Sequence, residues 1–559
     1  MRNKLIILIS LLILGLPAGR ILLTSSFFEP HDLHHLADIY QMYRSLESGQ
    51  FPPRWGPDFS FTYGYPLFNF YYLLPFYVGA FWLFISGSLI TSFKFVFLLS
   101  IFASIFGMYL LLREFVGKLP SLVGTALFLY TPYRAVQIFV RGAIGEVFII
   151  SLLPFVVFCL VKLIKNPSNL KMIAVASLVF FLFIISHNYL WVISLPFLFL
   201  LFFLYNKKQI WVKLRGLVLV TLLSLGMSSY WLIPALVEKK FVTSITPFPL
   251  IDHFPFIKQL ILPSWGYGSS VWGAGDEISF QIGIVNLLVF ISVAVLFILN
   301  KKIFNKNIRS LTIWAITGFL ISFVMMNSRS YPLWKLLPFH DFIQFPWRLL
   351  IFTTFFTAIM ASVLTEVLRK KMLVGSLIIF SSLLLTFNYF KPIQLVYKDD
   401  NDYLRRMFAN RNLQGEVDGV SEEYLNWSED YLLLPNWVAQ RPDELPPSKI
   451  TLLNGNVIDI HETNPVSWQA EVSAEQNAEI TFNSYYFPGW FAKLDGKPMN
   501  ISPGLPFGQI EASLPRGKHT VEFFWKESPL RKSADYLSLV SFSLAFLLFI
   551  KSDKKTKAF

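Results

Sequence analysis

The chain has 559 residues, of which 54% are hydrophobic and only 15% are charged, against about 25% charge in an ordinary soluble domain. It carries a net charge of +13 and one cysteine, Cys159, which lies in an apolar segment. These values exclude a soluble multidomain protein, an intrachain disulfide and a cysteine-based metal site. They also disfavour nucleic-acid binding, because residues 391–530 hold 20 acidic and 12 basic side chains and the cations elsewhere cluster in short loops.

The first apolar segment, 5–23, follows Arg2 and Lys4 and resembles a signal peptide. No small-residue cleavage site follows it, and many further apolar segments do, so we interpret it as a retained membrane helix. Segments of this length can cross a hydrocarbon core of about 30 Å. The candidate spans are 5–23, 72–90, 93–112, 119–134, 145–164, 172–187, 190–205, 216–234, 281–299, 309–327, 347–367, 372–389 and 535–551.

The stretch between the first spans, 24–92, is the densest polar region of the predicted membrane part. It opens with Glu29-Pro30-His31-Asp32-Leu33-His34-His35. On a helix, His31 and His35 would share a face and Asp32 would be a neighbour of His35. A carboxylate beside imidazoles at a membrane surface could take a proton from an acceptor hydroxyl, or hold a divalent cation. The alternative is a polar cap on a helix that enters the interface.

Segment 72–90 is apolar, but Pro75, Gly79 and Gly87 interrupt it, and Tyr- and Phe-rich sequence precedes it. Lys and Arg concentrate in cytoplasmic loops of membrane proteins. The basic clusters all fall on one side only if 72–90 does not cross. We therefore predict twelve crossings, cytoplasmic termini, and an interfacial or re-entrant helix at 72–90. The clusters are Arg2/Lys4, Lys162/Lys165/Lys171, Lys207/Lys208/Lys213/Arg215, Lys301/Lys302/Lys306/Arg309, Arg369/Lys370/Lys371 and Lys551/Lys554/Lys555/Lys557.

This topology places further polar groups on the external face, beside the His31–His35 loop. Arg141 could bind a phosphate oxygen, and Glu146 enters an apolar span, where a carboxylate usually marks a site. The alternative is an Arg141–Glu146 ion pair that locks the loop. His187 ends another span on the same side, where a lone His is often structural. Arg54 and Arg348 add cations to this face.

The stretch 391–534 has a different character, with Pro, Asn, Asp and Gly punctuation and alternating strand patterns. We predict an extracytoplasmic domain there, with a small β-sandwich over about 450–528. Aromatic groups around Trp490 and Trp525 are expected to form its core; binding a sugar or docking on the membrane are the alternatives. The predicted organisation is thus a membrane domain at 1–390, an external domain at 391–534, and a last helix with a basic tail at 535–559.

These features together resemble the GT-C superfamily of membrane glycosyltransferases. More closely, the chain resembles prokaryotic membrane proteins labelled "6-pyruvoyl-tetrahydropterin synthase-related" and the neighbouring YfhO-like family, although no residue pattern suggests pterin chemistry. The resemblance rests on His31–His35, Gly49–Asp58, Tyr63–Tyr71, Arg141–Glu146, Phe345–Arg348 and Tyr486–Trp490 with Asp495-Gly496.

The resemblance implies an integral membrane enzyme that moves a sugar from a polyprenyl-phosphate donor to a cell-envelope lipid, polymer or protein acceptor on the outer face of the plasma membrane. In GT-C enzymes an acidic residue in the first external loop acts as base or positions the acceptor, and Asp32 is the matching position. Many GT-C enzymes have two acids there, whereas His31 and Leu33 flank Asp32, so the need for a divalent cation stays open. The predicted substrate-binding residues are His31, His34, His35, Arg54, Arg141, Glu146, His187 and Arg348.

Two other functions fit the composition: a flippase or transporter of lipid-linked precursors, and a non-catalytic envelope assembly protein. No internal repeat supports a transporter. The sequence contains no Walker-type phosphate loop, no nucleotide-binding glycine pattern after a strand, and no zinc motif. These absences disfavour an ATP-driven pump and a nucleotide-sugar enzyme with a cytosolic catalytic domain.

Overall fold

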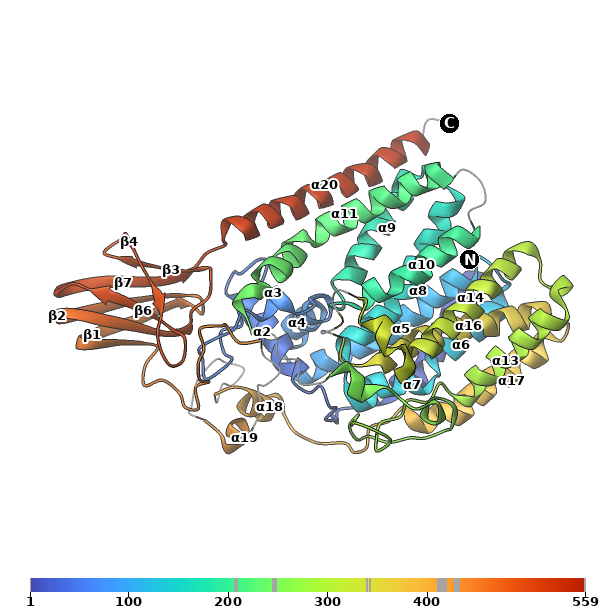
Figure 1. Cartoon of the computed structure of the whole chain (residues 1–559), viewed down its shortest axis with the longest axis horizontal. Coiled ribbons are helices and arrows are strands. Elements are labelled where there is room, and N and C mark those ends of the chain that lie inside the picture. The colour runs from blue at the N-terminus through green and yellow to red at the C-terminus, as the bar shows by residue number, and fades with distance from the viewer. Residues whose placement is uncertain are drawn as a thin grey trace.

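The chain is a polytopic α-helical membrane protein with an antiparallel β-domain placed before its last helix. The computed structural model describes residues 2–205, 210–243, 249–337, 340, 343–409, 420–426 and 433–556. Figure 1 shows a body of packed helices with the sheet standing at one end of it, and a last helix that runs from the sheet back along the body.

Every predicted span falls on an apolar helix. Eight helical segments are long and apolar enough to cross a membrane and five more are shorter, thirteen in all among the described residues. Side-chain caps begin several of them; for example, Asn169 and Asn305 each accept a backbone N–H of the following turn. The helices are α1 (Arg2–Gly19), α4 (Leu74–Ser86), α5 (Leu89–Leu112), α6 (Lys118–Leu129), α8 (Ile144–Lys165), α9 (Leu170–Ile184), α10 (Leu190–Tyr205), α11 (Ile210–Val237), α13 (Ile284–Leu299), α14 (Lys306–Met325), α16 (Leu350–Val367), α17 (Lys371–Thr386) and α20 (Pro529–Thr556).

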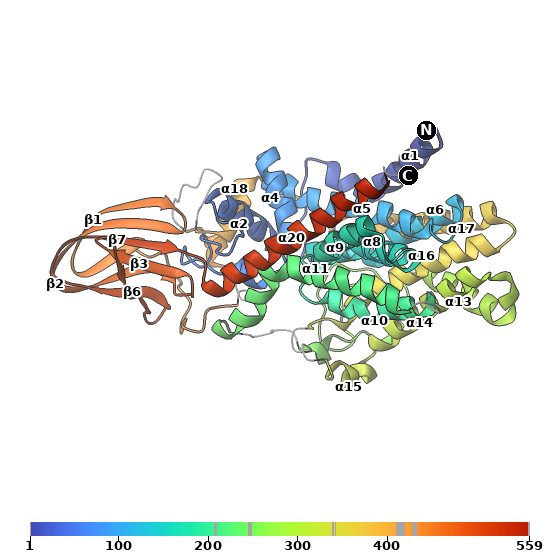
Figure 2. The same cartoon turned by 90° about the horizontal axis from the view of Figure 1, so that it is seen from above.

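Shorter helices fill the connections between these. They are α2 (His35–Glu47), α3 (Leu67–Phe70), α7 (Pro132–Ala135), which continues into a wider turn at Val136–Arg141, α12 (Ile257–Ile261), α15 (Tyr331–Trp334), α18 (Asp400–Met407) and α19 (Glu422–Leu425). The view in Figure 2 shows α20 lying along α9 and α11, with which it is in contact.

The connections gather at two ends of the helical body. At one, which we call the basic end, Lys162 and Lys165 both pair with Glu114 and Lys371 pairs with Glu366. At the other, which we call the site end, segments 24–32, 131–143, 185–189 and 389–407 meet; Phe27, for instance, bridges to Val396. The described basic loops and the predicted site loops thus lie apart.

The two ends of helix α4 lie at the same end of the helical body. Its length of 13 residues does not distinguish it from α6, which has 12, but the contacts at its ends do. The N–H groups of Leu73 and Leu74 donate to the Ile185 carbonyl, and just beyond its other end the Asp400 carboxylate accepts from Leu89 and Ile90. Both ends of α4 therefore lie at the site end, the arrangement that a non-crossing segment requires.

The first loop is a packed part of the protein rather than a surface excursion. Nine of the thirteen residues of α2 are buried. Farther on, Gly56 and Tyr65 form a backbone bridge, and the turn needs Gly64, whose φ is +78°. A Cβ at Gly64 would come within 2.2 Å of the Trp55 indole nitrogen.

The β-domain forms one continuous antiparallel sheet, where the sequence predicts the two sheets of a sandwich. Long strand β2 pairs with β1 along its length, with β7 through its first half and with β6 through its second half. Because one strand serves both halves, the sheet stays undivided. Its strands are β1 (Ile450–Asn464), β2 (Ser467–Tyr485), β3 (Trp490–Leu494), β4 (Lys497–Met499), β5 (Ser502–Pro503), β6 (Gln509–Leu514) and β7 (Gly517–Trp525).

The aromatic core expected for this domain is present. Tyr485, Phe487 and Phe523 are fully buried. Trp55, Tyr63 and Phe70 of the first loop belong to the same apolar cluster. The sheet and the first loop therefore share one core, a contact between segments that are about 400 residues apart in sequence.

Candidate active site

Backbone pairing between two loops builds the centre of the site end. The N–H of His31 donates to the Val140 carbonyl at 3.0 Å, and the N–H of Asp32 donates to the Arg141 carbonyl at 2.7 Å. This pairing sets the Asp32 carboxylate beside the Arg141 guanidinium, 3.4 Å from Nη2 to Oδ2. The Asp32 side chain is 27% exposed, so solvent or a substrate can reach it.

Glu146 holds two arginines in place. Arg141 Nη1 and Arg348 Nε both donate to its Oε1, the second at 2.7 Å. Its Oε2 accepts from the Tyr133 hydroxyl at 2.7 Å and, more weakly, from the Gln137 amide at 3.4 Å. The carboxylate is 2% exposed and saturated with donors, so it orients the cations and is not a free acid or base.

Aromatic rings fix the planes of both guanidinium groups. Arg141 lies 4.7 Å from the centroid of Trp347, and Arg348 lies 4.9 Å from that of Phe345. The Arg348 guanidinium also donates to the Tyr189 hydroxyl. Cations held over rings in this way lose little freedom when they take up an anion. Asp32, Arg141, Glu146 and Arg348 thus form one group, as the sequence predicts.

A second polar group lies on α2. Nδ1 of His35 is 2.9 Å from Oδ2 of Asp38, and Nε2 of His35 is 3.2 Å from the Tyr72 hydroxyl. The rings of His34 and His35 are 4.2 Å apart. The sequence reasoning overlooked Asp38, although its spacing of three and four residues from the two histidines could have placed it on their face of a helix.

Burial governs the protonation of this second group. It raises the pKa of Asp38 to about 7 and lowers the pKa of both His34 and His35 to about 4. Asp32 behaves differently: burial alone would raise its pKa, but the Arg141 guanidinium, with smaller effects from both imidazoles, holds it below its usual range. Asp32 is therefore ionised at neutral pH.

The second group also meets the donor requirements of a metal ion. One ligand atom each from His34, His35 and Asp38 lie within 4.8 Å of one another. Oδ1 of Asp38 is buried and has no hydrogen-bond partner among the described residues. Two imidazoles and a carboxylate suit a divalent transition metal. The candidate cation ligands are thus these three residues, and Asp32 is not one of them.

His187 joins the two groups by stacking. Its ring is nearly parallel to Tyr72, with centroids 5.6 Å apart, and meets Tyr189 edge-on at 4.9 Å. Burial, together with the nearby Arg348 cation, lowers its pKa to about 3. A buried neutral imidazole between two tyrosines positions its neighbours. His31 lies at the opposite, exposed edge of the site, where Nε2 is 2.7 Å from the Tyr267 carbonyl oxygen.

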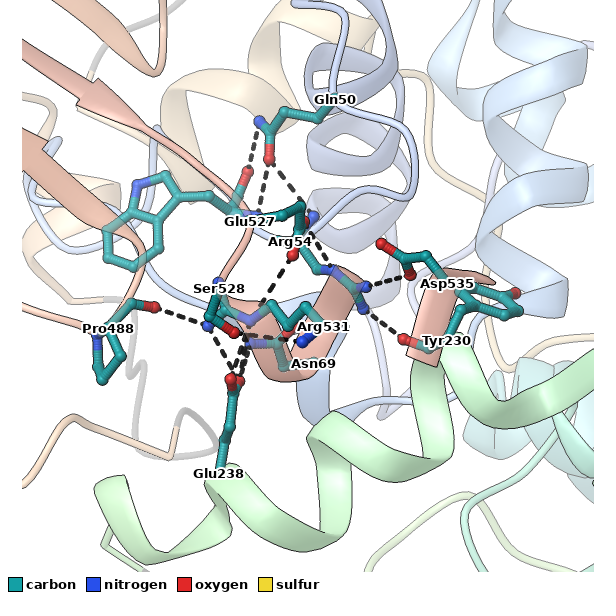
Figure 3. A network of polar contacts seen from close by, with 11 residues as sticks. Gln50, Arg54, Asn69, Tyr230, Glu238, Pro488, Glu527, Ser528, Arg531 and Asp535 are labelled. Carbon is teal, nitrogen blue, oxygen red and sulfur yellow. Dashed lines mark hydrogen bonds and ion pairs between the residues drawn. The ribbon is translucent and has the colours of Figure 1, made fainter. Parts of the chain in front are cut away.

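Arg54 does not reach this site. Its Nε donates to Glu527 at 3.1 Å, its Nη2 to Asp535 at 2.9 Å and its Nη1 to the Tyr230 carbonyl at 2.6 Å (Figure 3). The guanidinium is 1% exposed and engaged on all three nitrogens, so the prediction that it binds substrate is not supported. Its partners stand more than 170 residues away in sequence, beyond what loop patterns can reveal.

The same figure shows a second half of this network. Arg531, at the start of α20, makes three hydrogen bonds of 2.9 to 3.1 Å to the Glu238 carboxylate and one of 2.7 Å to the Pro488 carbonyl. Asn69 of the first loop also donates to Glu238, at 2.9 Å. We call the residues drawn in Figure 3 the joint, because they tie the first loop, α11, the sheet and α20 together.

Comparisons with known proteins give one family and a few distant structures. Residues 68–393, more than half of the chain, match the family described as "6-pyruvoyl-tetrahydropterin synthase related domain; membrane protein". In solved structures, the chain is similar to the arabinofuranosyltransferase AftD from Mycobacteria, with 13% identity and a TM-score of 0.48; the match covers 72% of this chain and 28% of AftD.

It is also similar to the apo oligosaccharyltransferase of Archaeoglobus fulgidus, with 12% identity and a TM-score of 0.43, over 78% of this chain and 60% of that one. In both cases the matched part is less than two thirds of the other protein. None of the curated proteins matches this sequence.

Proposed function

We propose that this chain, which belongs to the 6-pyruvoyl-tetrahydropterin synthase related family of membrane proteins, is a glycosyltransferase of GT-C type. It moves a sugar from a polyprenyl-phosphate donor to an acceptor hydroxyl at the outer face of the plasma membrane. One observation carries the proposal: a partly exposed, ionised carboxylate, Asp32, lies beside two arginines that the buried Glu146 holds in position.

The arginines suit the phosphate of the donor. Arg141 and Arg348 bring two positive charges to the edge of a nearly dry site, and Glu146 and Asp32 balance them. A departing lipid phosphate gains negative charge in the transition state, and fixed guanidinium groups stabilise that charge without rearranging. Their slight exposure, 7% and 11%, leaves a face for the phosphate oxygens.

Asp32 suits the acceptor. The acceptor oxygen forms a bond to the anomeric carbon while the bond from that carbon to the phosphate oxygen breaks, and the phosphate leaves with the electron pair. The hydroxyl proton passes to the Asp32 carboxylate. One such displacement inverts the anomeric centre. A divalent cation held by His34, His35 and Asp38 would supply positive charge near the reacting groups.

The predicted topology puts the site end on the outer side of the membrane. The basic loops lie at the end opposite to the site, and basic loops face the cytoplasm in most membrane proteins. Both ends of α4 lie at the site end. Twelve crossings, with both termini inside, the site end outside and 72–90 not crossing, are consistent with these features.

Replacing Asp32 by Asn tests the function. We expect the rate of sugar transfer to fall by about 10²- to 10⁴-fold, the usual contribution of a positioned acid or base, in a deletion strain that expresses the variant. The measurement is mass spectrometry of envelope glycans and glycolipids. Glu47→Gln, on the same loop but half exposed, is the matched control. Full product with Asp32→Asn would overturn the assignment.

A further inference from the structure

A second polar feature lies next to the site and is not used by the chemistry above. Residues 264–268, 276–278 and Ile393 line an open cleft of about 580 Å³, within the size range of small-ligand sites. A backbone bridge between Tyr267 and Ile278 forms its wall. The bridge needs Gly266, because a Cβ there would come within 1.9 Å of the Glu277 carbonyl oxygen; at Gly268 a Cβ would come within 2.0 Å of the Glu277 carboxylate.

Aromatic rings make one side of the cleft. Trp265 and Tyr267 stand at 90° to each other with centroids 5.8 Å apart. Trp265 stacks on Tyr389 at 4.2 Å, and the Tyr267 hydroxyl donates to the Lys391 carbonyl at 3.0 Å, so both rings are fixed. A corner of rigid aromatic rings presents apolar surface that matches the C–H faces of a sugar ring.

Acidic groups make the other side. The Asp276 carboxylate accepts from the Gln259 amide at 2.9 Å and from the Val271 N–H at 3.0 Å, so it is used by the loop itself. The exposed Glu277 carboxylate accepts no hydrogen bond from the described residues and is free to accept from a ligand hydroxyl. No Lys or Arg is among the described lining residues, which makes the cleft unfit for a phosphate.

The cleft connects to the reactive group through His31. The carbonyl oxygen of Tyr267 is 2.7 Å from the His31 imidazole, and His31 precedes Asp32 in the chain. We propose that this cleft is the acceptor subsite and that it binds a neutral, hydroxyl-rich glycan. This inference rests on the proposed function and assigns the two substrates to different residues. The arginines bind the charged donor, while the aromatic rings and Glu277 bind the uncharged acceptor.

Photo-crosslinking in living cells identifies the occupant. Benzoylphenylalanine is placed at Ile393, which lines the cleft and is 70% exposed, or at Tyr397, which is 84% exposed and outside it. We expect a glycan adduct from position 393 and none from position 397, as read by mass spectrometry of the purified protein. A phospholipid adduct at 393, or equal labelling at both positions, would overturn the proposal.

A kinetic measurement gives an independent answer. Glu277→Gln is expected to raise the KM for envelope glycan, extracted from a strain that lacks the protein, by about tenfold, the effect of one hydrogen bond to a charged group. The KM for the lipid donor and kcat should stay within about twofold. Trp272→Phe, on the same loop and 78% exposed, is the control. An unchanged acceptor KM in Glu277→Gln would contradict the assignment.

The two proposals fail in different ways. A glycan adduct at position 393 without any sugar transfer would keep the cleft as a glycan site and remove the transferase function. Transfer that depends on Asp32, with no glycan adduct and an unaltered acceptor KM, would keep the function and remove the cleft from it.

Discussion

Glu146 is the residue on which the geometry of the site depends. The sequence left two interpretations open for it, a site residue or half of a locking ion pair with Arg141, and the structure joins them. It pairs with Arg141, and it also pairs with Arg348 from a helix 200 residues farther along. Local spacing pointed to the first partner only.

Removing this charge should disable the site and loosen the helical body. Glu146→Gln keeps the shape but leaves two buried guanidinium groups with one carboxylate, Asp32. Breaking a buried ion pair costs about 3 to 5 kcal/mol. We expect a clearly lower midpoint of thermal unfolding in nanodiscs and loss of transfer activity. Tyr133→Phe, which removes only the 2.7 Å hydrogen bond from the hydroxyl to Glu146, should have a much smaller effect; equal effects of both variants would contradict this role.

The buried histidines predict how stability responds to pH. The pKa of His187 is lowered to about 3 in the folded protein from its ordinary value of 6.5. Between these two pH values the unfolded chain binds a proton at His187 and the folded chain does not. The contribution of His187 to the free energy of unfolding is therefore complete above pH 6.5 and is lost progressively as the pH falls toward 3. His34 and His35 act in the same direction down to about pH 4.

Asp38, whose pKa is raised to about 7, acts in the opposite direction between about pH 4 and 7, since its folded form keeps a proton that the unfolded form releases. The three histidines outnumber it, so the free energy of unfolding should fall on acidification below pH 6.5. His187→Phe keeps a ring beside Tyr72 and removes one of these protons. Thermal unfolding across this pH range should show a shallower acid-side slope in the variant, and an unchanged slope would exclude His187 as a contributor.

At the scale of elements, the sequence predicted what hydropathy controls. All thirteen apolar segments are helices, because the hydropathy of a segment depends only on the residues of that segment. Contacts between distant segments could not be predicted from local patterns. Two examples are the hydrogen bonds of Arg54 to α11 and α20, and the pairing of β2 with both β6 and β7, which makes one sheet of the two halves. Helical spacing could have identified Asp38, but no local pattern predicts that the first loop and the sheet share one core.

The turn at Gly64 offers a sharp test of the first loop. Gly49 and Gly64 both have φ near +80°, so Ala at either position carries the strain of a left-handed backbone, about 1 to 2 kcal/mol. Only at Gly64 would the added Cβ also collide with Trp55; at Gly49 nothing lies within 4 Å. We expect Gly64→Ala to lower the thermal unfolding midpoint well beyond Gly49→Ala. Similar midpoints would show that the loop does not pack as described.

For the whole molecule, the joint decides whether the sheet and the helical body move as one. Arg54 belongs to the first loop and Arg531 to α20. Their guanidinium groups bind carboxylates and carbonyls of α11 and the turn after it, of the sheet domain and of α20. Both guanidinium groups are at most 1% exposed. Buried and multiply bonded, these contacts define a fixed geometry between the two parts.

Arg54→Met should loosen the contact between the sheet and the helical body. It leaves Asp535 without its cation and Glu527 with only Arg531, whose Nε is 3.9 Å away. We expect faster proteolysis and faster backbone hydrogen exchange near residues 50–56 and 526–530. Lys493→Met, which removes an exposed pair with Glu522 on the sheet, should change neither, because exposed pairs contribute little. If proteolysis and hydrogen exchange at these two stretches were the same as in the native protein, the joint would not be what holds the sheet to the helical body.

The shared core of first loop and sheet also constrains how the protein is made. Trp55, Tyr63 and Phe70 leave the ribosome early, yet their packing partners in the sheet follow roughly 400 residues later. At a synthesis rate of about 5 to 20 residues per second, the loop waits on the order of 20 to 80 seconds. During that interval an aromatic surface stands uncovered, so a chain that stops short of the sheet is expected to be a substrate for quality-control proteases rather than a smaller working protein.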